Sequence, residues 1–299
     1  MVQQLVSYGL ERESLLCVTC GNRVVDCGTG ACSMCHTPLE VSRSVAKRKR
    51  PCRFVTVIGA SGAGKTVYLG MLLDMLSQGH TELRCIPNGA FSVSVQQQTI
   101  SALQQRRFPE KTAAESDQWN WVHCEAYHAK KPKQAIDIVT PDLAGESIAL
   151  EMNQPGTYPS IKHALRNSNG IVMLFDSTSV RDNGRSEDMF GMKLVSYVAS
   201  LQADKANRRG KITTPVAITF TKSDCCREAS DAPEQFAHAN MSGLVQSCKS
   251  RLLNHQFFAA SVVGSTTSIL DEHGARVQIP LHVEPHGVIA PFRWIMQNI

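Results

Sequence analysis

Residues 59 to 66 constrain the fold of this chain more than any other segment. They read Gly-Ala-Ser-Gly-Ala-Gly-Lys-Thr, which matches the phosphate-binding loop pattern G-x-x-x-x-G-K-[ST] at every fixed position. The apolar run 54–58 precedes the loop, and a segment with helical spacing follows it. The sequence therefore predicts a strand, a phosphate-binding loop and a helix. The backbone N–H groups of such a loop point at phosphate oxygens, with the positive end of the helix behind them.

The residues of this loop have separate predicted tasks. Three glycines let the backbone curl, the ammonium of Lys65 reaches the β- and γ-phosphates, and the hydroxyl of Thr66 binds Mg²⁺. The predicted nucleotide contacts in the loop are Gly59, Ser61, Gly62, Ala63, Gly64, Lys65, Thr66 and Val67. The alternative is an ordinary glycine turn between a strand and a helix. The fit of both flanks favours the nucleotide site.

A second motif, D-x-x-G, follows the strand-like run 135–141. At the carboxyl end of a strand beside the phosphate loop, Asp142 is expected to hold Mg²⁺ through water, and the N–H of Gly145 to sense the γ-phosphate. Asp137 is the competing acid. We favour Asp142 because a glycine follows it three residues later, and because a strand interior is a poor place for an unpaired carboxylate.

A third motif selects the base. The apolar run 215–220 leads into Thr-Lys-Ser-Asp at residues 221–224, a form of the N/T-K-x-D element. A carboxylate at Asp224 can accept two hydrogen bonds from guanine, which adenine cannot offer, while the stem of Lys222 lies on the base. Thr221, Lys222 and Asp224 are therefore predicted nucleotide contacts.

These motifs together resemble those of P-loop GTPases. Residues 53 to about 264 carry them in the order of the translation-factor and small-GTPase class, followed by a short base loop at Ser261 and Val262. The resemblance implies an α/β fold, GTP and Mg²⁺ as cofactors, and hydrolysis of GTP to GDP and phosphate. More narrowly, the segments 142–146, 108–112 and 285–295 resemble those of bacterial double-GTPase proteins in multi-gene conflict or defence systems.

Glu146 departs from the pattern of many GTPases. They carry a glutamine there, which orients the attacking water, whereas a carboxylate adds negative charge near the γ-phosphate. We therefore expect slow hydrolysis. Thr112 is either the switch threonine that contacts Mg²⁺ and the γ-phosphate or a plain loop threonine, and Arg106 or Arg107 is either an arginine finger in cis or a solvated residue at a helix end. The predicted catalytic residues are Lys65, Thr112 and Glu146.

Four cysteines near the amino terminus predict a metal site. They are Cys17, Cys20, Cys32 and Cys35, which form two C-x2-C pairs separated by eleven residues. Each pair can grip one metal ion, and four thiolates suit tetrahedral Zn²⁺. Disulfides are the alternative, which a reducing compartment disfavours. Cys27 and His36 are close in sequence and are expected to be bystanders.

A basic segment follows the predicted zinc ribbon. Residues 43–53 contain six Lys or Arg and no acid, and residues 1–53 carry a net charge of +4 out of the chain's +5. We predict a zinc ribbon at 1–42, a basic linker at 43–52 and a P-loop GTPase domain at 53–299. Because the GTPase body is nearly neutral, the sequence assigns any contact with a polyanion to the linker, alone or together with the ribbon. A solvated linker is the simpler interpretation.

Length and patterning predict one α/β core with a small appendage. The predicted strands lie at 53–58, 119–127, 134–140, 170–175, 214–220 and 256–261, and the predicted helices at 65–78, 92–107, 158–167, 186–205 and 233–252. This alternation predicts a mainly parallel sheet with helices on both faces, except for one antiparallel hairpin at 119–140. Trp119 and Trp121 are expected to share a strand face, as packing residues or, if exposed, as a partner surface.

The chain is expected to be cytoplasmic, because no apolar run is long enough to cross a bilayer and the first residues lack the pattern of a signal peptide. The leading hypothesis is a GTP-binding switch that hydrolyses GTP slowly and signals through segments 106–118 and 143–160 to protein partners encoded with it. One alternative is a nucleotide-gated module with negligible hydrolysis, in which the ribbon recognises protein or nucleic acid. Another is an ATPase, if Asp224 does not reach the base.

Overall fold

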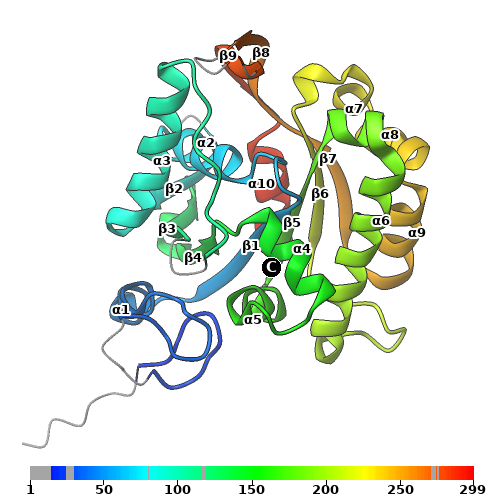
Figure 1. The fold of residues 1–299 in the computed structure, drawn as a ribbon. Helices are drawn as coiled ribbons and strands as arrows, with labels where there is room; N and C mark the ends of the chain where they lie inside the picture. Colours follow the sequence, from blue (N-terminus) through cyan, green and yellow to red (C-terminus); the bar gives the residue numbers. More distant parts are fainter. Residues whose placement is uncertain (1–14, 25–29, 80, 116–118, 271–273, 275) are drawn as a thin grey trace, which may run out of the picture.

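The computed structural model describes residues 15–24, 30–79, 81–115, 119–270, 274 and 276–299 (Figure 1). A seven-stranded sheet lies at its centre, with the strand order β2-β3-β4-β1-β5-β6-β7. Its strands are β1 (Cys52–Gly59), β2 (Leu83–Pro87), β3 (Trp121–His128), β4 (Ile136–Pro141), β5 (Gly170–Asp176), β6 (Val216–Thr221) and β7 (His255–Ala259). A separate hairpin of β8 (Ser261–Leu270) and β9 (Arg276–His286) stands at the top of Figure 1.

The sheet is mainly parallel, as predicted. The neighbours β4, β1, β5, β6 and β7 pair in parallel, whereas β2 and β3 at one edge pair antiparallel. The predicted hairpin is confirmed by the antiparallel pairing of β3 with β4, whose turn contains only a short 3-10 helix, Pro132–Gln134. The parallel strands need longer crossovers, and helices supply them.

Helices cover both faces of the sheet (Figure 1). They are α1 (Leu39–Arg48), α2 (Lys65–Ser77), α3 (Gly89–Gln104), α4 (Gly145–Asn153), α5 (Pro159–Asn167), α6 (Ser177–Leu201), α7 (Arg227–Asp231), α8 (Pro233–Asn240), α9 (Ser242–Arg251) and α10 (Ile289–Asn298). Side chains of β5 alternate between the two faces. Met173 and Phe175 join the core with α5, α6, α8 and α9, whereas Val172 and Leu174 join the core with α2, α3 and α10. Burial on both faces explains why these strands read as continuous apolar runs.

Several elements differ from the sequence prediction. The strand β2, the helices α4 and α10, and the hairpin of β8 and β9 lie outside the predicted set. The helix predicted at 186–205 begins earlier because Asp176 caps it, accepting a hydrogen bond from the N–H of Thr178 at 2.9 Å. The helix predicted at 233–252 is two helices, α8 and α9, separated at Met241.

Only Trp121 lies in a strand, because β3 begins there, which corrects the predicted strand start at residue 119. Trp119 precedes β3 and packs on Tyr158, with ring centroids 5.9 Å apart. Trp121 lies in β3 and meets Phe54 edge to face, with centroids 6.3 Å apart. Both are buried, so both are packing residues rather than a partner surface.

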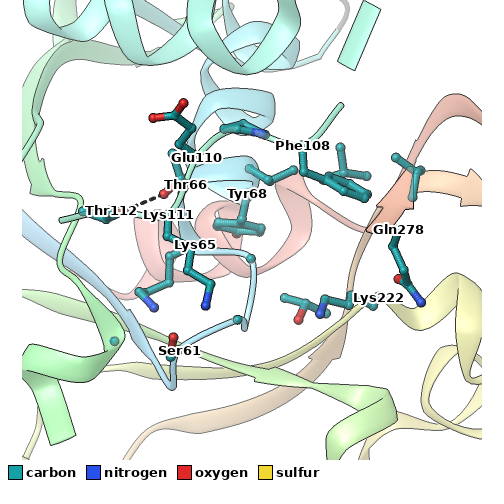
Figure 2. Close-up of a pocket in the computed structure, with 18 of the residues that line it drawn as sticks. Ser61, Lys65, Thr66, Tyr68, Phe108, Glu110, Lys111, Thr112, Lys222 and Gln278 are labelled. Atoms are coloured by element: carbon teal, nitrogen blue, oxygen red, sulfur yellow. Dashed lines mark hydrogen bonds between the residues drawn. The ribbon is translucent and has the colours of Figure 1, made fainter. Parts of the chain in front are cut away.

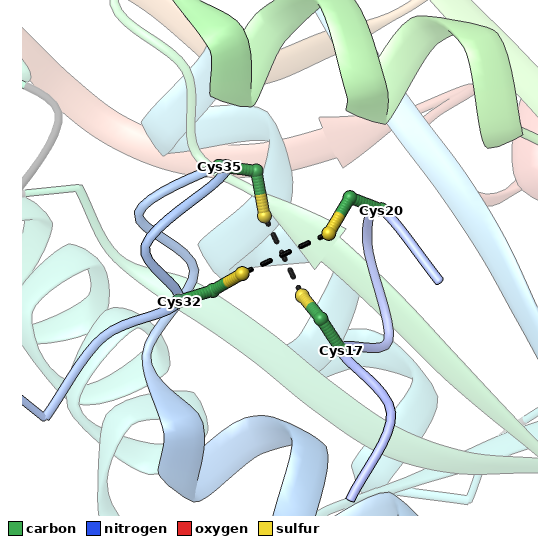
Figure 3. Close-up of side chains that lie close together, drawn as sticks. All are labelled: Cys17, Cys20, Cys32 and Cys35. Carbon is green, nitrogen blue, oxygen red and sulfur yellow. Dashed lines mark hydrogen bonds between the residues drawn. The ribbon is translucent and has the colours of Figure 1, made fainter. Parts of the chain in front are cut away.

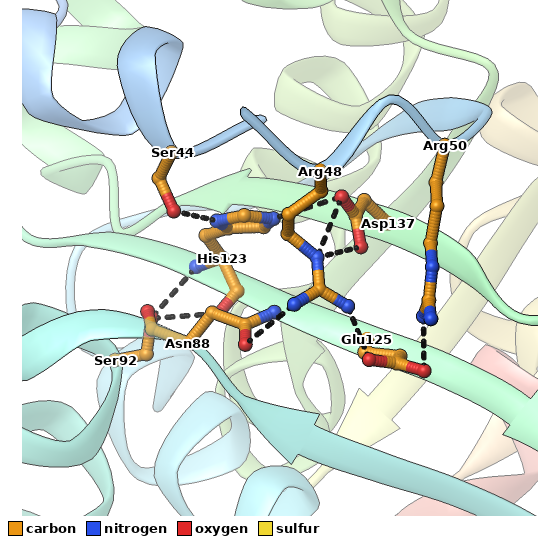
Figure 4. Close-up of polar contacts among 8 residues, drawn as sticks. All are labelled: Ser44, Arg48, Arg50, Asn88, Ser92, His123, Glu125 and Asp137. Carbon is orange, nitrogen blue, oxygen red and sulfur yellow. Dashed lines mark hydrogen bonds and ion pairs between the residues drawn. The ribbon is translucent and has the colours of Figure 1, made fainter. Parts of the chain in front are cut away.

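The segment predicted as a solvated linker is part of the fold. The boundary predicted after residue 42 falls inside α1, and β1 already begins at Cys52. Arg48 donates from Nε to Oδ1 of Asp137 at 2.9 Å and pairs with Glu125, which Arg50 also contacts (Figure 4). Because Asp137 is fully buried and needs a cationic partner, these contacts hold α1 against β3 and β4. The sequence around the basic run does not indicate these ion pairs, because the acidic partners lie far away along the chain.

Candidate nucleotide and metal sites

The phosphate loop lies between β1 and α2, at the carboxyl end of the parallel strands (Figure 2). Gly62 and Gly64 have φ angles of +79° and +78°, in the left-handed region that favours glycine. Gly64 directly precedes α2, which begins at Lys65. The unpaired N–H groups of the first helical turn therefore face the loop, as an anion site requires.

Gly145 of the D-x-x-G motif lies directly against this loop. A Cβ atom at Gly145 would lie 2.3 Å from the nitrogen of Ser61 and 2.5 Å from the carbonyl carbon of Ala60. Gly59 is equally crowded, since a Cβ there would lie 2.3 Å from the carbonyl oxygen of Leu174. Only glycine permits these approaches. The two motifs, far apart in sequence, are thus in contact.

Lys65 is buried beneath the loop. Its ammonium donates to the carbonyl oxygens of Gly59 at 3.2 Å and Ala60 at 2.9 Å. Burial lowers the pKa of Lys65 to about 8, while the nearby carboxylates of Asp142 and Glu146 oppose that shift. A phosphate group over the loop would raise the pKa again, because an opposite charge favours the ammonium form.

Three side chains converge next to α2. Thr66 donates from Oγ1 to Oδ2 of Asp142 at 2.9 Å, and Thr112 Oγ1 lies 2.9 Å from Thr66 Oγ1 and 3.2 Å from the same carboxylate oxygen. Burial raises the pKa of Asp142. Its other oxygen, Oδ1, is buried and has no hydrogen-bond partner within the described part of the chain. A carboxylate oxygen in need of a partner, beside two hydroxyls, fits Mg²⁺, which prefers oxygen ligands.

The competing acid, Asp137, does not reach this cluster. It lies nearer the start of β4 than Asp142 and pairs with Arg48, so the strand-interior carboxylate has a structural partner. Asp142 therefore stays the predicted Mg²⁺ ligand of the pair.

The base-selecting motif is attached to both the phosphate loop and the base loop. Thr221 donates from Oγ1 to the carbonyl oxygen of Ala63 at 2.9 Å. Ser261 donates from Oγ to Oδ1 of Asp224 at 2.6 Å, and Lys222 pairs with Asp176. Three segments that the sequence predicts to contact one nucleotide therefore form one connected group.

A cavity of about 330 Å³ joins these parts. The predicted residues that line it are Ser61, Gly62, Gly64, Lys65, Thr66, Val67, Thr112, Gly145, Glu146, Thr221, Lys222, Asp224 and Val262. Four other predicted residues do not line the cavity, but each forms a hydrogen bond with a residue that does. They are Gly59, Ala63, Asp142 and Ser261. The size of the cavity suits a small ligand such as a nucleotide.

A family model described as Double-GTPase 1 matches residues 56–266. The chain belongs to the double-GTPase 1 family. Membership supports GTP binding and, in general terms, GTP hydrolysis.

Among the solved structures that resemble this double-GTPase 1 family member are two from eukaryotic organisms. The chain is similar to nucleolar GTP-binding protein 1 from Plasmodium falciparum, with 12% identity, coverage of 83% of this chain and 86% of that chain, and a TM-score of 0.37. It is also similar to the signal recognition particle receptor SRb-GTP/SRX complex from Chaetomium thermophilum, with 14% identity, coverage of 73% and 93%, and a TM-score of 0.41. No curated protein matches the chain.

The nucleotide cavity of this family member also contains residues that the motifs do not indicate. They are Tyr68, Phe108, Pro109, Glu110, Lys111, Ala144, Cys225, Ala260, Val263, Thr266 and Gln278. Figure 2 places Lys111 next to Lys65, and Gln278 opposite them near Lys222. Thr266 and Gln278 come from β8 and β9, a hairpin with no motif of its own. Sequence reasoning had no signal for them.

Of the candidate catalytic side chains considered next, one lies at the phosphate loop and two do not. Glu146 lies at the start of α4, where its Oε1 accepts a hydrogen bond from Ser61 Oγ at 3.2 Å. Arg106 and Arg107 are exposed, and no arginine lines the cavity in the described ranges. The structure therefore brings Glu146 to the phosphate loop but brings neither arginine there.

The four predicted zinc ligands form a second site, at the opposite end of the sheet. Their Sγ atoms all lie within 4.8 Å of one another, and Cys17–Cys35 and Cys20–Cys32 are 3.4 and 3.7 Å apart (Figure 3). A tetrahedral zinc site with Zn–S bonds of about 2.3 Å has sulfur atoms about 3.8 Å apart. A disulfide bond would need about 2 Å. The cluster is thus compatible with one Zn²⁺.

The ribbon around this cluster is docked onto α5. Ser160 donates from Oγ to the carbonyl oxygen of Cys35 at 2.5 Å, and Asn167 donates from Nδ2 to that of Thr19 at 2.6 Å. His36 is exposed and outside the cluster, and Cys27 lies outside the described residues.

In the described part of the chain, no helix has the length and apolar character needed to span a membrane.

Proposed function

We propose that this protein is a GTP-binding switch that hydrolyses GTP slowly and that a protein partner accelerates. The observation that carries the proposal is the convergence of Thr66, Thr112 and Asp142 beside the phosphate loop. Thr112 belongs to the loop after α3, and Asp142 follows β4, so two separate segments each place one side chain where Mg²⁺ and the γ-phosphate would lie. Loss of the γ-phosphate would release both segments, as in other nucleotide switches.

The roles proposed for the site residues follow from their positions. Lys65 holds the phosphates, Thr66 and Asp142 hold Mg²⁺, and Asp224 selects guanine. Bound Mg²⁺ would neutralise negative charge on the phosphates. The Thr221 contact with Ala63 keeps the base-selecting loop in register with the phosphate loop. The two connected loops would thus bind both the phosphates and the base of the nucleotide.

Slow hydrolysis is proposed because of Glu146. Its contact with Ser61 of the phosphate loop supports a role in orienting an attacking water, but its charge adds to that of the transferring group. Lys111 also lines the cavity, and a lysine provides only a point charge, without the bidentate contacts of a guanidinium. A partner that supplies a cation, or that moves the water, would therefore raise the rate.

The proposed partner surface comprises the segments 106–118 and 143–160, of which residues 116–118 lie outside the described residues. Within the latter, residues 153–157 are exposed, and the side chain of Leu150 is 45% exposed next to the candidate catalytic Glu146 on α4. An exposed apolar side chain on a helix that begins at the γ-phosphate sensor suits contact with a partner. The likeness to proteins of multi-gene defence systems supports partners encoded with this chain.

Single-turnover GTP hydrolysis tests this proposal. We expect the isolated protein to turn over no faster than about once per minute. Glu146→Gln should change that rate and leave GTP affinity nearly unaltered, because the side chain would act on the water and not on bound GTP. Glu110→Gln is the matched control, since Glu110 lines the same cavity but points away from the phosphate loop in Figure 2.

The outcomes separate the candidate functions. A rate above one per second without a partner, or an effect of Glu146→Gln confined to GTP binding, would contradict a slow, partner-dependent switch. Tight GTP binding with no measurable hydrolysis would favour the nucleotide-gated module. Equal affinity for ATP and GTP would favour the ATPase.

A further inference from the structure

Five segments of the chain gather at the end of the sheet opposite the nucleotide cavity. They are residues 129–135 before β4, 43–53 leading into β1, 159–168 before β5, 203–213 before β6 and 247–255 leading into β7. Because these five strands are parallel neighbours in this order, the segments lie side by side. Figure 1 shows two of their helices, α1 and α5, below the sheet. We call this end the amino-end face.

Hydrogen bonds join neighbouring segments of the amino-end face. The N–H of Ile212 donates to the carbonyl oxygen of Arg251 at 2.9 Å, which joins the segments before β6 and β7. Directly after the ends of two further segments, the N–H of Asn169 donates to the carbonyl oxygen of Phe54 at 2.7 Å. Lys205 donates from Nζ to the carbonyl oxygen of Ser168 at 2.8 Å. The segments before β5, β6 and β7 are therefore connected to one another, and the segment leading into β1 lies beside them.

The amino-end face concentrates positive charge. Its five segments hold 17 of the chain's 31 Lys and Arg residues but only one of its 26 Asp and Glu residues, Asp204. Their net charge is +16, whereas that of the whole chain is +5, so everything else sums to −11. The nearly neutral net charge of the GTPase body is thus the sum of a basic face and of acidic parts elsewhere, so cations of the body join those of the linker as candidates for contact with a polyanion.

Much of this charge is available for binding. Arg48 and Arg50 pair with Glu125, and Lys130 pairs with Glu82. Within the described ranges, several exposed cations of the face form no ion pair, namely Arg166, Arg208, Arg209, Lys249 and Arg251. An exposed cation without a partner keeps its attraction for an anion.

Cations from different segments lie near enough to act on the same groups. Burial lowers the pKa of His255, and Lys211 of one segment and Lys249 of the next add to that shift, while Glu234 opposes it. Burial likewise lowers the pKa of Lys205, and Arg166 from the neighbouring segment adds to this effect, while Asp204 opposes it. The face therefore carries like charges held close together, which an anion would relieve.

The spacing of the charged segments suits a polymer of regularly repeated anions. Neighbouring strands are about 4.8 Å apart, so the face extends about 19 Å from β4 to β7. One strand of a nucleic acid duplex presents about one phosphate per 3.4 Å of axis, or about six over that span. A second hollow, lined by Asn207, Arg208, Arg209, Lys211 and Leu253, lies on the same face. We propose that the amino-end face binds the phosphate backbone of a nucleic acid, with little dependence on sequence.

Fluorescence anisotropy with a labelled 20-base-pair DNA duplex and a labelled 20-nucleotide RNA tests this proposal on the full chain. We expect affinity to fall steeply with salt, because each phosphate contact releases counterions. Arg208→Glu/Arg209→Glu should weaken binding at least about tenfold and reduce the salt slope by about two. Adding Lys249→Glu/Arg251→Glu should weaken it further. The matched control is Arg185→Glu/Arg276→Glu, two exposed arginines outside the five segments.

The affinities for nucleic acid and for GTP test the proposal, and neither measurement depends on GTP hydrolysis. The control variant should bind both nucleic acids within about twofold of wild type, and every variant should keep its GTP affinity, which shows that it is folded. The proposal is overturned if neither nucleic acid binds at low salt, or if the Arg208 and Arg209 reversals act no more than the control. Binding to anionic lipid vesicles or poly-glutamate, with none to nucleic acid, would assign the face to another class of partner.

Discussion

The two ends of the parallel sheet differ in how the sequence encodes them. At the carboxyl end, short motifs with fixed spacing place Lys65, Asp142 and Asp224 around one cavity. At the amino end, the cations are scattered over five segments without a shared pattern, and only the fold brings them together. A site for one ligand can be recognised in the sequence from a motif with fixed spacing. A charged face made of separate segments can be recognised only after the strand order is known.

The zinc ribbon is the part of the amino end that does carry a motif, and removing its metal should have the largest effect. We predict one Zn²⁺ per chain, and Cys32→Ser should reduce it towards zero, because three thiolates leave a tetrahedral site incomplete. Structural zinc supplies about 10 to 16 kcal/mol in small domains, so the ribbon should also unfold. Metal analysis and amide hydrogen exchange of residues 15–42 measure both effects.

Cys27→Ser is the control for this change and should leave the zinc content at one. The opposite pattern would reassign the ligands. GTP affinity should stay within about threefold in Cys32→Ser, since the described residues of the ribbon contact α5 and do not line the nucleotide cavity. A larger loss would show that the two ends of the sheet are coupled.

Features with a local sequence pattern could be predicted, whereas features that depend on residues far apart in the chain could not. The parallel sheet, its antiparallel hairpin and the phosphate loop could be predicted because strand burial and left-handed glycines leave direct marks on the sequence. The Arg48 pair with Asp137 could not, because the two residues are 89 positions apart and a local charge run resembles a solvated linker. Gln278 could not either, since β9 brings it to the cavity without any motif.

Asp224 offers the sharpest change at the carboxyl end. We expect the wild type to prefer guanine over adenine at least about a hundredfold, because the wrong base would leave this carboxylate unpaired. Asp224→Asn should shift the preference towards xanthine nucleotides, whose extra carbonyl needs a donor. Competition binding with GTP, ATP and XTP measures it, and zinc content should not change. A wild type that binds ATP as well as GTP would remove the basis for the GTP-binding switch.

Lys65 should have a somewhat smaller effect, at the same end. Lys65→Ala removes a charge-assisted contact worth about 2 to 3 kcal/mol, so GTP affinity should fall about 30- to 150-fold. Thr66→Ala should act similarly in the presence of Mg²⁺, through loss of a metal ligand. Equilibrium titration with labelled GTP is the measurement, and Lys162→Ala on the amino-end face is the control. Binding by Lys65→Ala within twofold of wild type would refute the loop assignment.

The smallest predicted effect is a pH dependence confined to the carboxyl end. The pKa of Lys65 is lowered to about 8 by burial, so the free protein loses this proton as the pH rises through 8. Bound phosphates favour the ammonium, and GTP binding above that pH must take up a proton. Affinity should therefore be flat below about pH 7 and about tenfold weaker at pH 9. Calorimetry in buffers of different ionisation enthalpy should show proton uptake at pH 8.5. Lys65→Arg, which stays charged, should show neither effect, and an equal slope in that variant would place the titrating group elsewhere.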